Sequence, residues 1–346
     1  MVNFLRPFIF KFSPEVAHSL AIKALKLNNF PGNKIVKSEI LQTNFCGKML
    51  SSPIGVAAGF DKNAEVYNPL FNLGFGFVEV GTITPKPQYG NPKPRVFRLE
   101  EDEALINRLG FNNTGSEEIS SRIIKETKKG ILGINIGPNK DTENRIDDYL
   151  NCFKKFHSLA DYITINISSP NTEKLRDFHN QDELSSLIKG LKNEKNKLNS
   201  KIPIAIKVSP DLNDEQIDIV SNILLDYEIE IVIVSNTSDK NRDKLNNINQ
   251  LEKGGLSGKP LFEVSNRIIS KFYRHIGKKI KIIGVGGVDS GQTAFEKIIR
   301  GASLVQLYTG MVYKGPRIAS LISSELIDIL KNKGFKNVSE AIGTKN

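Results

Sequence analysis

The sequence predicts an α/β fold, a (β/α)8 TIM barrel with a small N-terminal helical extension. The chain has 346 residues, and barrels of this class form single domains of roughly 200–250 residues or more. Eight short apolar, β-rich runs alternate with helical stretches, as in such a barrel. Most of these runs are hydrophobic without alternation, which is typical of parallel strands covered on both faces.

The expected strands are bounded by glycine, proline or asparagine. They occupy residues 53–59, 76–83, 130–137, 161–168, 202–210, 229–236, 281–287 and 303–310. Between them, Thr114 and Glu117 have the spacing of a capping box, and another helix is expected from Ser290 to Arg300. A doubly wound sheet is the alternative, because the number of strands does not show that the sheet closes.

Two connections are longer than a minimal barrel requires. Residues 84–129 contain an expected hairpin, in which the strands VFRL and ALIN are joined by the turn EEDE. Residues 237–280 contain GGLSGKP. Long connections in compact domains are usually functional. We therefore expect both to contribute to a site.

Composition and charge exclude several classes of protein. With 39% hydrophobic and 25% charged residues, the chain should bury a full core. Cys46 and Cys152 have no metal or disulfide spacing and are expected to be reduced structural thiols in the cytoplasm, and the four histidines also lack metal-ligand spacing. No apolar run of ~18 residues could span a bilayer, and no signal peptide is indicated.

The net charge of +10 is unevenly distributed. Residues 1–38 carry six basic side chains and a single acidic one, Glu15. Such charge could meet nucleic acid, an anionic membrane or an acidic ligand. Its concentration in the N-terminal extension favours the membrane, and no nucleic-acid partner is expected.

Polar residues gather at the ends of the predicted strands, where barrel enzymes carry their active sites. They are Asp61, Lys62, Thr82, Asn135, Asn166, Ser168, Ser169, Lys207, Asn236 and Thr237. Each could be a turn former or a snorkelling side chain. Together they would be costly buried polar groups without partners, so we expect a bound polar cofactor to supply those partners.

Glycines near the seventh strand suggest how that cofactor is held. They are Gly254, Gly255, Gly258, Gly284, Gly286 and Gly287. Glycine turns leading into helices can hold a phosphate by backbone N–H groups, although such glycines can also serve tight turns alone. Asp289 stands where the dinucleotide fingerprint has its third glycine, so one phosphate is favoured over a pyrophosphate.

In these motifs the chain resembles the dihydroorotate dehydrogenase family, specifically its membrane-associated, quinone-dependent class. The resemblance covers nearly the whole chain. It rests on AAGFDKN (57–63), GTITPKPQ (81–88), PRVFRL (94–99), NRLGFNN (107–113), NIGPNK (135–140), NISSPNT (166–172), IKVSPD (206–211), SNT (235–237), GGLSGKPL (254–261), GVGG (284–287) and LVQLYTG (304–310).

The resemblance implies oxidation of dihydroorotate to orotate in pyrimidine biosynthesis, with flavin mononucleotide (FMN) as cofactor and a membrane quinone as electron acceptor. It assigns the FMN to Ala58, Gly59, Phe60, Asp61, Lys62, Thr82, Asn135, Asn166, Lys207, Ser235, Gly258, Gly287, Tyr308 and Thr309. It assigns the substrate to Lys62, Asn107, Arg108, Leu109, Gly110, Phe111, Asn166, Asn171, Asn236 and Thr237. Asparagines suit a ring imide, Lys62 a carboxylate, and Lys207 developing negative charge on the flavin.

By the same resemblance, Ser169 is the catalytic base. A hydroxyl is a poor base, and no histidine lies in the local motif to activate it, so Thr172 is a candidate to relay the proton to water. In the soluble classes of the family a cysteine occupies this position. The serine therefore also indicates the quinone-dependent class.

Residues 1–38 are expected to form a helical, membrane-associated quinone-access region, and residues 39–346 the barrel. Ser13 and Pro14 would begin a helix with Val16, Leu20, Ala24 and Leu27 on one face. Such a helix suits the surface of a membrane, which predicts a peripheral protein on the cytoplasmic side of the cell membrane. Capping the bottom of the barrel is the alternative role.

His18, Arg98 and Tyr308 are candidate residues of the quinone tunnel. Two departures from the family pattern stand out. Ala64 replaces a common glycine, and Val312 occupies a position that can be polar, which leaves the preferred quinone open.

Two other functions compete with this interpretation. A flavin-dependent tRNA dihydrouridine synthase would suit the basic charge, but its cysteine acid has no counterpart here. A barrel that binds a sugar phosphate without redox chemistry is the second alternative.

Overall fold

The computed structural model describes residues 7–27, 35–240 and 242–346. Eight parallel strands close into a barrel in chain order, which confirms the predicted fold class and excludes the doubly wound sheet. The strands are β3 (Ile54–Val56), β4 (Phe77–Ile83), β7 (Ile131–Ile136), β8 (Tyr162–Asn166), β9 (Ile204–Val208), β10 (Ile231–Val234), β12 (Lys281–Val285) and β13 (Ala302–Leu307). Each lies within, or one residue beyond, the run that predicted it.

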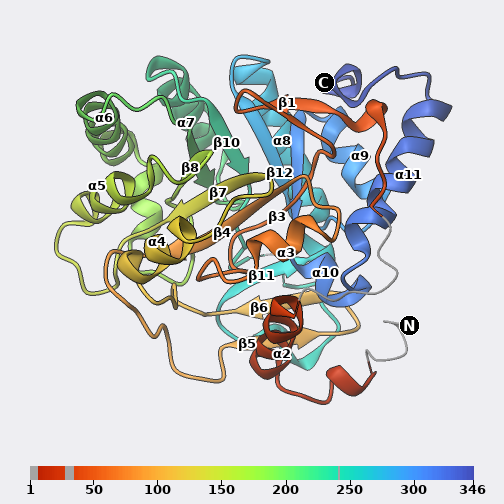
Figure 1. Cartoon of the computed structure of the whole chain (residues 1–346), viewed down its shortest axis with the longest axis horizontal. Helices are drawn as coiled ribbons and strands as arrows, with labels where there is room; N and C mark the ends of the chain where they lie inside the picture. Colours follow the sequence, from red (N-terminus) through yellow and green to blue (C-terminus); the bar gives the residue numbers. More distant parts are fainter. Residues whose placement is uncertain (1–6, 28–34, 241) are drawn as a thin grey trace.

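Helices surround the barrel and cover the outer faces of its strands (Figure 1). They are α3 (Tyr67–Phe71), α4 (Ser116–Ile124), α5 (Arg145–Phe156), α6 (Gln181–Lys197), α7 (Asp214–Asp226), α8 (Phe262–Ile276), α9 (Gly291–Ile299), α10 (Thr309–Lys314) and α11 (Ile318–Asn332). Short 3₁₀ turns lie at η1 (Glu39–Leu41), η2 (Leu175–His179), η3 (Ile248–Leu251), η4 (Lys259–Leu261) and η5 (Val338–Ala341). Coverage on both faces explains why the strands read as continuous apolar runs.

The structure confirms the predicted start of one helix and contradicts the predicted cap of another. Ser290 caps α9 in a capping box with Thr293, as the expected start of that helix requires. The predicted box at Thr114 is wrong, because α4 begins after Gly115 and receives no side-chain cap. Asn113 instead accepts a hydrogen bond from the Gly115 amide at 2.8 Å, which leaves the Thr114 hydroxyl buried without a partner.

The two ends of the barrel are closed differently (Figure 1). A short hairpin, β1 (Thr43–Phe45) and β2 (Lys48–Leu50), closes the amino end, where Phe45 and Leu50 pack on Phe77 and Tyr162. A three-stranded antiparallel sheet stands over the carboxyl end. It contains the predicted hairpin, β5 (Val96–Leu99) and β6 (Ala104–Asn107), and β11 (Gly255–Gly258), part of the segment expected as a glycine loop.

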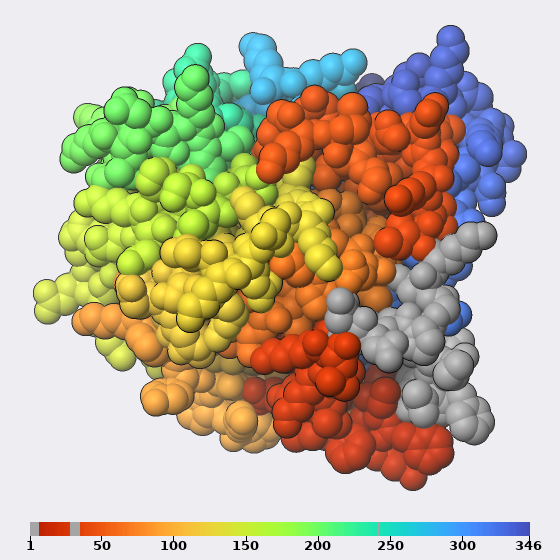
Figure 2. Space-filling view, in the orientation of Figure 1, coloured from red at the N-terminus to blue at the C-terminus, as the bar shows by residue number. Residues whose placement is uncertain are grey.

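The N-terminal helix α2 (Pro14–Lys26) lies against this small sheet. It begins at the predicted proline after the N-cap Ser13. Ala17 and Leu25 are buried, and Glu15 pairs with the buried Arg95 at 3.0 Å. Figure 2 shows residues 7–27 in red at the lower edge of the molecule.

The apolar face of α2 points away from the barrel. Val16, Leu20 and Leu27 are 47%, 46% and 79% exposed, and Phe8 and Phe12 before the helix are also exposed. The predicted region 1–38 falls partly outside the described residues, since residues 1–6 and 28–34 are not described. No helix within the described parts of the chain is long and apolar enough to cross a membrane.

Candidate active site

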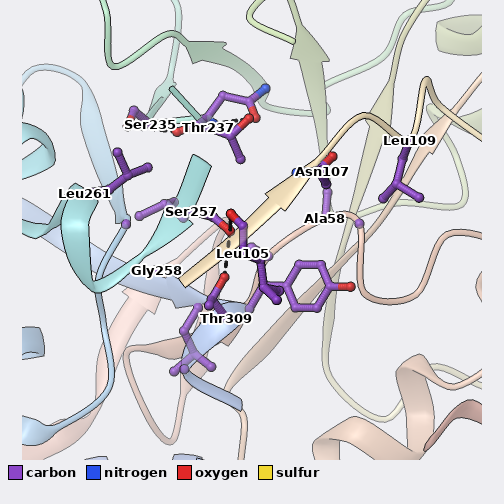
Figure 3. Close-up of a pocket in the computed structure, with 18 of the residues that line it drawn as sticks. Ala58, Leu105, Asn107, Leu109, Ser235, Thr237, Ser257, Gly258, Leu261 and Thr309 are labelled. Atoms are coloured by element: carbon purple, nitrogen blue, oxygen red, sulfur yellow. Dashed lines mark hydrogen bonds between the residues drawn. The ribbon is translucent and has the colours of Figure 1, made fainter. Parts of the chain in front are cut away.

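A cavity lies between the carboxyl ends of the barrel strands and the small sheet above them (Figure 3). The barrel supplies its floor and walls from the ends of β3, β4, β8, β9, β10, β12 and β13, and β6 and β11 supply its roof. Roof and wall are joined by a 2.8 Å hydrogen bond between the hydroxyls of Ser257 and Thr309, drawn as a dashed line in Figure 3.

Most of the predicted site residues line this cavity. From the barrel and its loops they are Ala58, Gly59, Lys62, Thr82, Asn166, Ser169, Asn171, Lys207, Ser235, Asn236, Thr237, Gly287, Tyr308 and Thr309. From the small sheet and the loop after β6 they are Asn107, Leu109, Gly110, Phe111 and Gly258. Residues as distant in the sequence as Ala58 and Thr309 therefore line one cavity.

Four predicted residues lie off the cavity lining. Phe60 packs edge-on against His18 and Tyr308. The Asp61 carboxylate accepts hydrogen bonds from two backbone amides, both at 2.8 Å, and so fixes the turn after β3, although burial raises its pKa to about 6. Arg108 points to the outside of the small sheet, where it pairs with Glu252 at 2.6 Å.

Asn135, the fourth, lies beneath the cavity in a chain of buried polar groups. Thr82 Oγ1 donates to Asn135 Oδ1 at 2.7 Å and accepts from Asn166 Nδ2 at 3.0 Å. Asn135 Nδ2 in turn donates to the carboxylate of Glu79 at 2.9 Å. This chain fixes the orientation of Thr82 and Asn166, the two members that reach the cavity.

Glu79 is a fully buried carboxylate inside the barrel that sequence reasoning missed. Besides Asn135, it accepts hydrogen bonds from three side chains at 3.0–3.1 Å. The donors are Tyr162, Thr164 and Gln306. The signal was a lone glutamate within the apolar strand GFVEVGTI, because a charge buried in such a strand requires dedicated donors.

Lys207 brings a positive charge to the cavity from β9. Its side chain is 5% exposed, and none of the described residues accepts a hydrogen bond from its ammonium group. Burial lowers the pKa of Lys207, and the nearby Glu79 partly offsets that effect. A buried cation that lines a cavity in this way requires an acceptor from a bound molecule.

Asparagines and serines surround the next part of the cavity. Asn236 Nδ2 donates to Asn166 Oδ1 at 3.2 Å and to the Ser168 hydroxyl at 3.0 Å. Asn171 Nδ2 donates to the backbone oxygen of Asn107 at 3.0 Å and so joins the loop after β8 to the roof. This wall offers both donors and acceptors to a polar ring.

Ser169 lies in the loop after β8 and is 6% exposed. Its Oγ accepts a hydrogen bond from the Asn171 amide at 3.2 Å. Ser169 and Thr172 are both described, and no hydrogen bond joins their hydroxyls. The direct relay suggested by the sequence is therefore absent from this conformation.

Arg176 braces this loop and was not singled out from the sequence. Its guanidinium donates to the backbone oxygens of Ser168 at 3.3 Å and Thr237 at 3.2 Å. It also pairs with Asp211 and Asp239. The loop that carries Ser169 is thereby tied to the loop that follows β10.

Lys62 lines the cavity at the turn after β3. Its ammonium donates to the Gly59 carbonyl at 2.8 Å, and burial lowers its pKa to about 8. The neighbouring Ala64 has φ 53°, a left-handed conformation that explains why glycine is common at this position.

Glycines allow close packing at the opposite side of the cavity. A Cβ on Gly287 would lie 2.6 Å from the Cβ of Phe262, and one on Gly258 would lie 2.4 Å from the carbonyl oxygen of Glu103. Both residues have positive φ, and with Gly286 and Thr309 they line the cavity. These bare backbone groups are suited to an anion.

A second cavity lies under α2, and its lining shares five residues with the first: Lys62, Val96, Leu109, Asn112 and Tyr308. His18 and Tyr308, two of the predicted tunnel residues, both line it. Burial and the charge of Lys62 lower the pKa of His18 to about 3, so its imidazole is neutral.

Arg98, the third predicted tunnel residue, is outside both linings. Its guanidinium lies over the Phe10 ring, 4.6 Å from its centroid, and donates to the Phe12 carbonyl at 2.9 Å. It holds the segment before α2.

A family model, two curated proteins and a solved structure that resemble this chain all belong to one family of enzymes. The family model for dihydroorotate dehydrogenase matches residues 40–330. The dihydroorotate dehydrogenase (quinone) of Bartonella tribocorum is 46% identical over 340 residues, covering 97% of this chain and 94% of its own. That of Agrobacterium fabrum is 44% identical over 339 residues, covering 97% and 93%. The crystal structure of the Eimeria tenella dihydroorotate dehydrogenase with ferulenol superposes with a TM-score of 0.92 at 38% identity, covering 96% of this chain and 95% of that one.

Proposed function

Since the chain belongs to the dihydroorotate dehydrogenase (quinone) family and catalyses quinone-dependent oxidation of dihydroorotate in pyrimidine biosynthesis, we propose that the cavity of its barrel binds FMN together with dihydroorotate. The observation that carries this proposal is the buried Lys207 ammonium, which has no acceptor among the described residues. The family uses a flavin. A flavin ring supplies acceptor atoms for such a cation.

The residues of the cavity fit FMN in two further respects. Gly258, Gly286 and Gly287 leave room for a phosphate beside backbone N–H groups. Thr82 and Asn166 are held by their own hydrogen bonds at the floor of the cavity. The proposed FMN residues on the cavity lining are Ala58, Gly59, Lys62, Thr82, Asn166, Lys207, Ser235, Gly258, Gly287, Tyr308 and Thr309. Phe60, Asp61 and Asn135, which lie off the lining, would support them from behind. Bound FMN would supply the acceptor for a hydride.

The proposed substrate wall consists of asparagines and one lysine. Asn171 and Asn236 would bind the polar ring of dihydroorotate, and Lys62 its carboxylate. The full proposed set is Lys62, Asn107, Arg108, Leu109, Gly110, Phe111, Asn166, Asn171, Asn236 and Thr237. The outward position of Arg108 limits it to supporting the small sheet through Glu252.

Ser169 would take the proton from the carbon next to the substrate carbonyl while its own hydroxyl proton passes to water. Its Oγ already accepts from the Asn171 amide, and this bond stabilises negative charge on the oxygen when the proton is shared. Arg176 would keep the serine in place by bracing its loop. Removal of the proton by Ser169 and loss of the hydride from the adjacent carbon together create the carbon–carbon double bond of orotate.

The N-terminal region would bring the protein to the cytoplasmic face of the membrane as a peripheral protein. Residues 1–38 would form this region and residues 39–346 the catalytic barrel. The exposed Phe12, Val16 and Leu20 would lie against the bilayer, and quinone would reach the barrel through the cavity under α2.

One experiment tests the cofactor and the acceptor together. The purified protein should show flavin absorbance, and dihydroorotate should bleach it under anaerobic conditions. A quinone should then restore the absorbance far faster than fumarate or NAD does. Lys207→Met should lower the rate of bleaching about a hundredfold, because it removes the charge beside the proposed ring. A colourless, carefully prepared protein, or an unchanged Lys207→Met variant, would contradict the proposed cofactor site.

Removing the N-terminal region tests its role separately. A variant that lacks residues 1–38 should keep bleaching by dihydroorotate and lose reoxidation by quinone. Normal quinone reduction by this variant would exclude the proposed access route.

A further inference from the structure

The 3₁₀ turn η3, in the long connection between β10 and β12, presents two apolar side chains to solvent. Ile248 is 82% exposed and Leu251 is 84% exposed. In a 3₁₀ helix, side chains three residues apart lie on the same face. The turn therefore carries a small apolar surface that covers nothing in the barrel.

This turn is held in place by hydrogen bonds. The Asp102 carboxylate accepts from the amides of Asn246 at 3.0 Å and Asn247 at 3.1 Å. The Asn247 side chain accepts from the Asn249 amide at 3.0 Å, and the buried Leu245 anchors the preceding residues. A segment fixed in this way exposes its two apolar side chains as part of its structure, so a partner for them is expected.

The position of the turn indicates that partner. Asn249 Nδ2 donates to the backbone oxygen of Arg98 at 2.9 Å. The Arg98 guanidinium donates to the carbonyls of Phe10 at 3.2 Å and Phe12 at 2.9 Å. One residue thus contacts both the turn and the N-terminal segment with its exposed Phe8 and Phe12. In Figure 1, α2 and the small sheet of β5 lie at the same end of the molecule.

Charged side chains of both signs surround the turn. Lys244 and Lys253 flank the apolar pair and are exposed. Of the nearby acids, Glu252 is paired with Arg108 at 2.6 Å, whereas Asp243 is exposed. Glu101 is also exposed, and it accepts a hydrogen bond from the Asn247 side chain. Apolar side chains next to lysines are the usual composition of a segment that enters the headgroup region of an anionic bilayer.

We propose that Ile248 and Leu251 enter the same bilayer as the N-terminal segment and form a second point of membrane contact. This inference rests on the proposed membrane association of residues 1–38. A single amphipathic helix leaves the protein free to roll about the helix axis. A second contact beside β5 removes that freedom and keeps the cavity under α2 facing the bilayer.

Vesicle binding by the full-length protein tests the proposal. The double variant Ile248→Ser with Leu251→Ser should partition onto mixed phosphatidylcholine and phosphatidylglycerol vesicles about tenfold less than the unsubstituted protein, because it loses two apolar side chains from the contact. Ile124→Ser is the matched control, since Ile124 is 67% exposed on α4, which packs beside α5 in the ring of helices. It should bind as the unsubstituted protein does.

The outcomes separate this inference from the proposed function. If the unsubstituted protein binds vesicles and the double variant binds equally well, the second contact is excluded and the N-terminal one stands. If the unsubstituted protein does not bind, the proposed membrane association fails and the second contact fails with it. Unchanged oxidation of dihydroorotate with a water-soluble quinone shows that the double variant is folded.

A fluorescence experiment locates the turn directly. The chain contains no tryptophan, so Leu251→Trp places a single tryptophan at the proposed contact and Ile124→Trp places one outside it, each excited selectively at long wavelength. Vesicles should shift the emission of the first to shorter wavelength, and lipids with a brominated chain should quench it. Emission of Leu251→Trp that stays unchanged while the protein sediments with vesicles would overturn the proposal.

Discussion

The barrel cavity and the N-terminal surface depart in opposite directions from the rule that polar residues are usually exposed and apolar residues usually buried. In the barrel, Glu79, Asn135 and Lys207 are polar or charged and buried, whereas on α2 and before it Phe12 and Leu20 are apolar and exposed. Folding alone favours neither arrangement, since buried polar groups need partners and exposed apolar groups lose contact with the core. Glu79 and Asn135 find their partners inside the barrel, whereas Lys207 and the exposed apolar side chains do not, and we propose that molecules from outside the chain supply those partners. The proposed molecule is polar in the barrel and apolar at the N-terminal surface.

Among the substitutions that test this difference between the two regions, we expect the largest effect on a rate from Ser169 in the barrel cavity. Ser169→Ala should lower the rate of flavin bleaching by dihydroorotate about a thousandfold, because it removes the proposed proton acceptor from the cavity. The rate is measured by stopped flow without oxygen. Ser169→Cys is the matched variant and should keep part of the rate, since a thiolate can accept the proton. Full rates for Ser169→Ala at every pH would show that another group is the base.

Glu79→Gln tests whether the polar interior of the barrel depends on charge. We expect it to lower the free energy of unfolding by about 2 kcal/mol, because the new amide would point hydrogens at groups that already donate to Glu79. Urea unfolding gives the value. Glu118→Gln on the surface of α4, where the carboxylate is 56% exposed, should change it by less than about 0.5 kcal/mol. Equal effects for the two substitutions would mean that the Glu79 network contributes no special stability.

Lys62 gives a prediction about pH. Its pKa is lowered to about 8, so the ammonium loses its charge as the pH rises through that value. Binding of the dihydroorotate carboxylate should weaken, and kcat/KM should fall about tenfold for each pH unit above it. In Lys62→Arg the guanidinium stays protonated, and this fall should disappear. A profile that stays level in the unsubstituted enzyme would remove Lys62 from the substrate site.

The smallest effect is expected on the N-terminal surface, with Leu20→Ser. The side chain is 46% exposed, so the free energy of unfolding should change by less than about 0.5 kcal/mol. Activity with a quinone embedded in vesicles should nevertheless fall severalfold, while activity with a water-soluble quinone is unchanged. A loss of stability without a loss of vesicle-dependent activity would show that Leu20 contributes to folding and not to membrane contact.

The barrel could be predicted because its signals are local. Most of its strands are nearly continuous apolar runs, and most strand ends carry polar residues that reach the cavity. Asn166 and Lys207 were found in this way although they lie 41 positions apart in the sequence. The sequence did not reveal that Asn135 lies below the cavity. That position depends on how far along the barrel axis each strand extends, which follows from the packing of all eight strands.

Other features were missed because they depend on distant partners. The hairpin of β1 and β2 has only three residues in each strand, too few for a periodic pattern. The strand β11 pairs with β6, about 150 residues earlier, and its glycines indicate a loop when read alone. Arg176 acts through backbone oxygens of two separate loops, which no sequence motif records.

The attachment of α2 has a consequence for how the molecule folds. The helix buries only two apolar residues, Ala17 and Leu25, and its ion pairs join it to the barrel through Glu15 and Lys26. Opening α2 alone should therefore cost much less free energy than unfolding the barrel. We expect the helix to exchange its amide hydrogens before the barrel strands do. The part of the chain proposed to meet the bilayer is thus able to rearrange while the catalytic barrel remains folded.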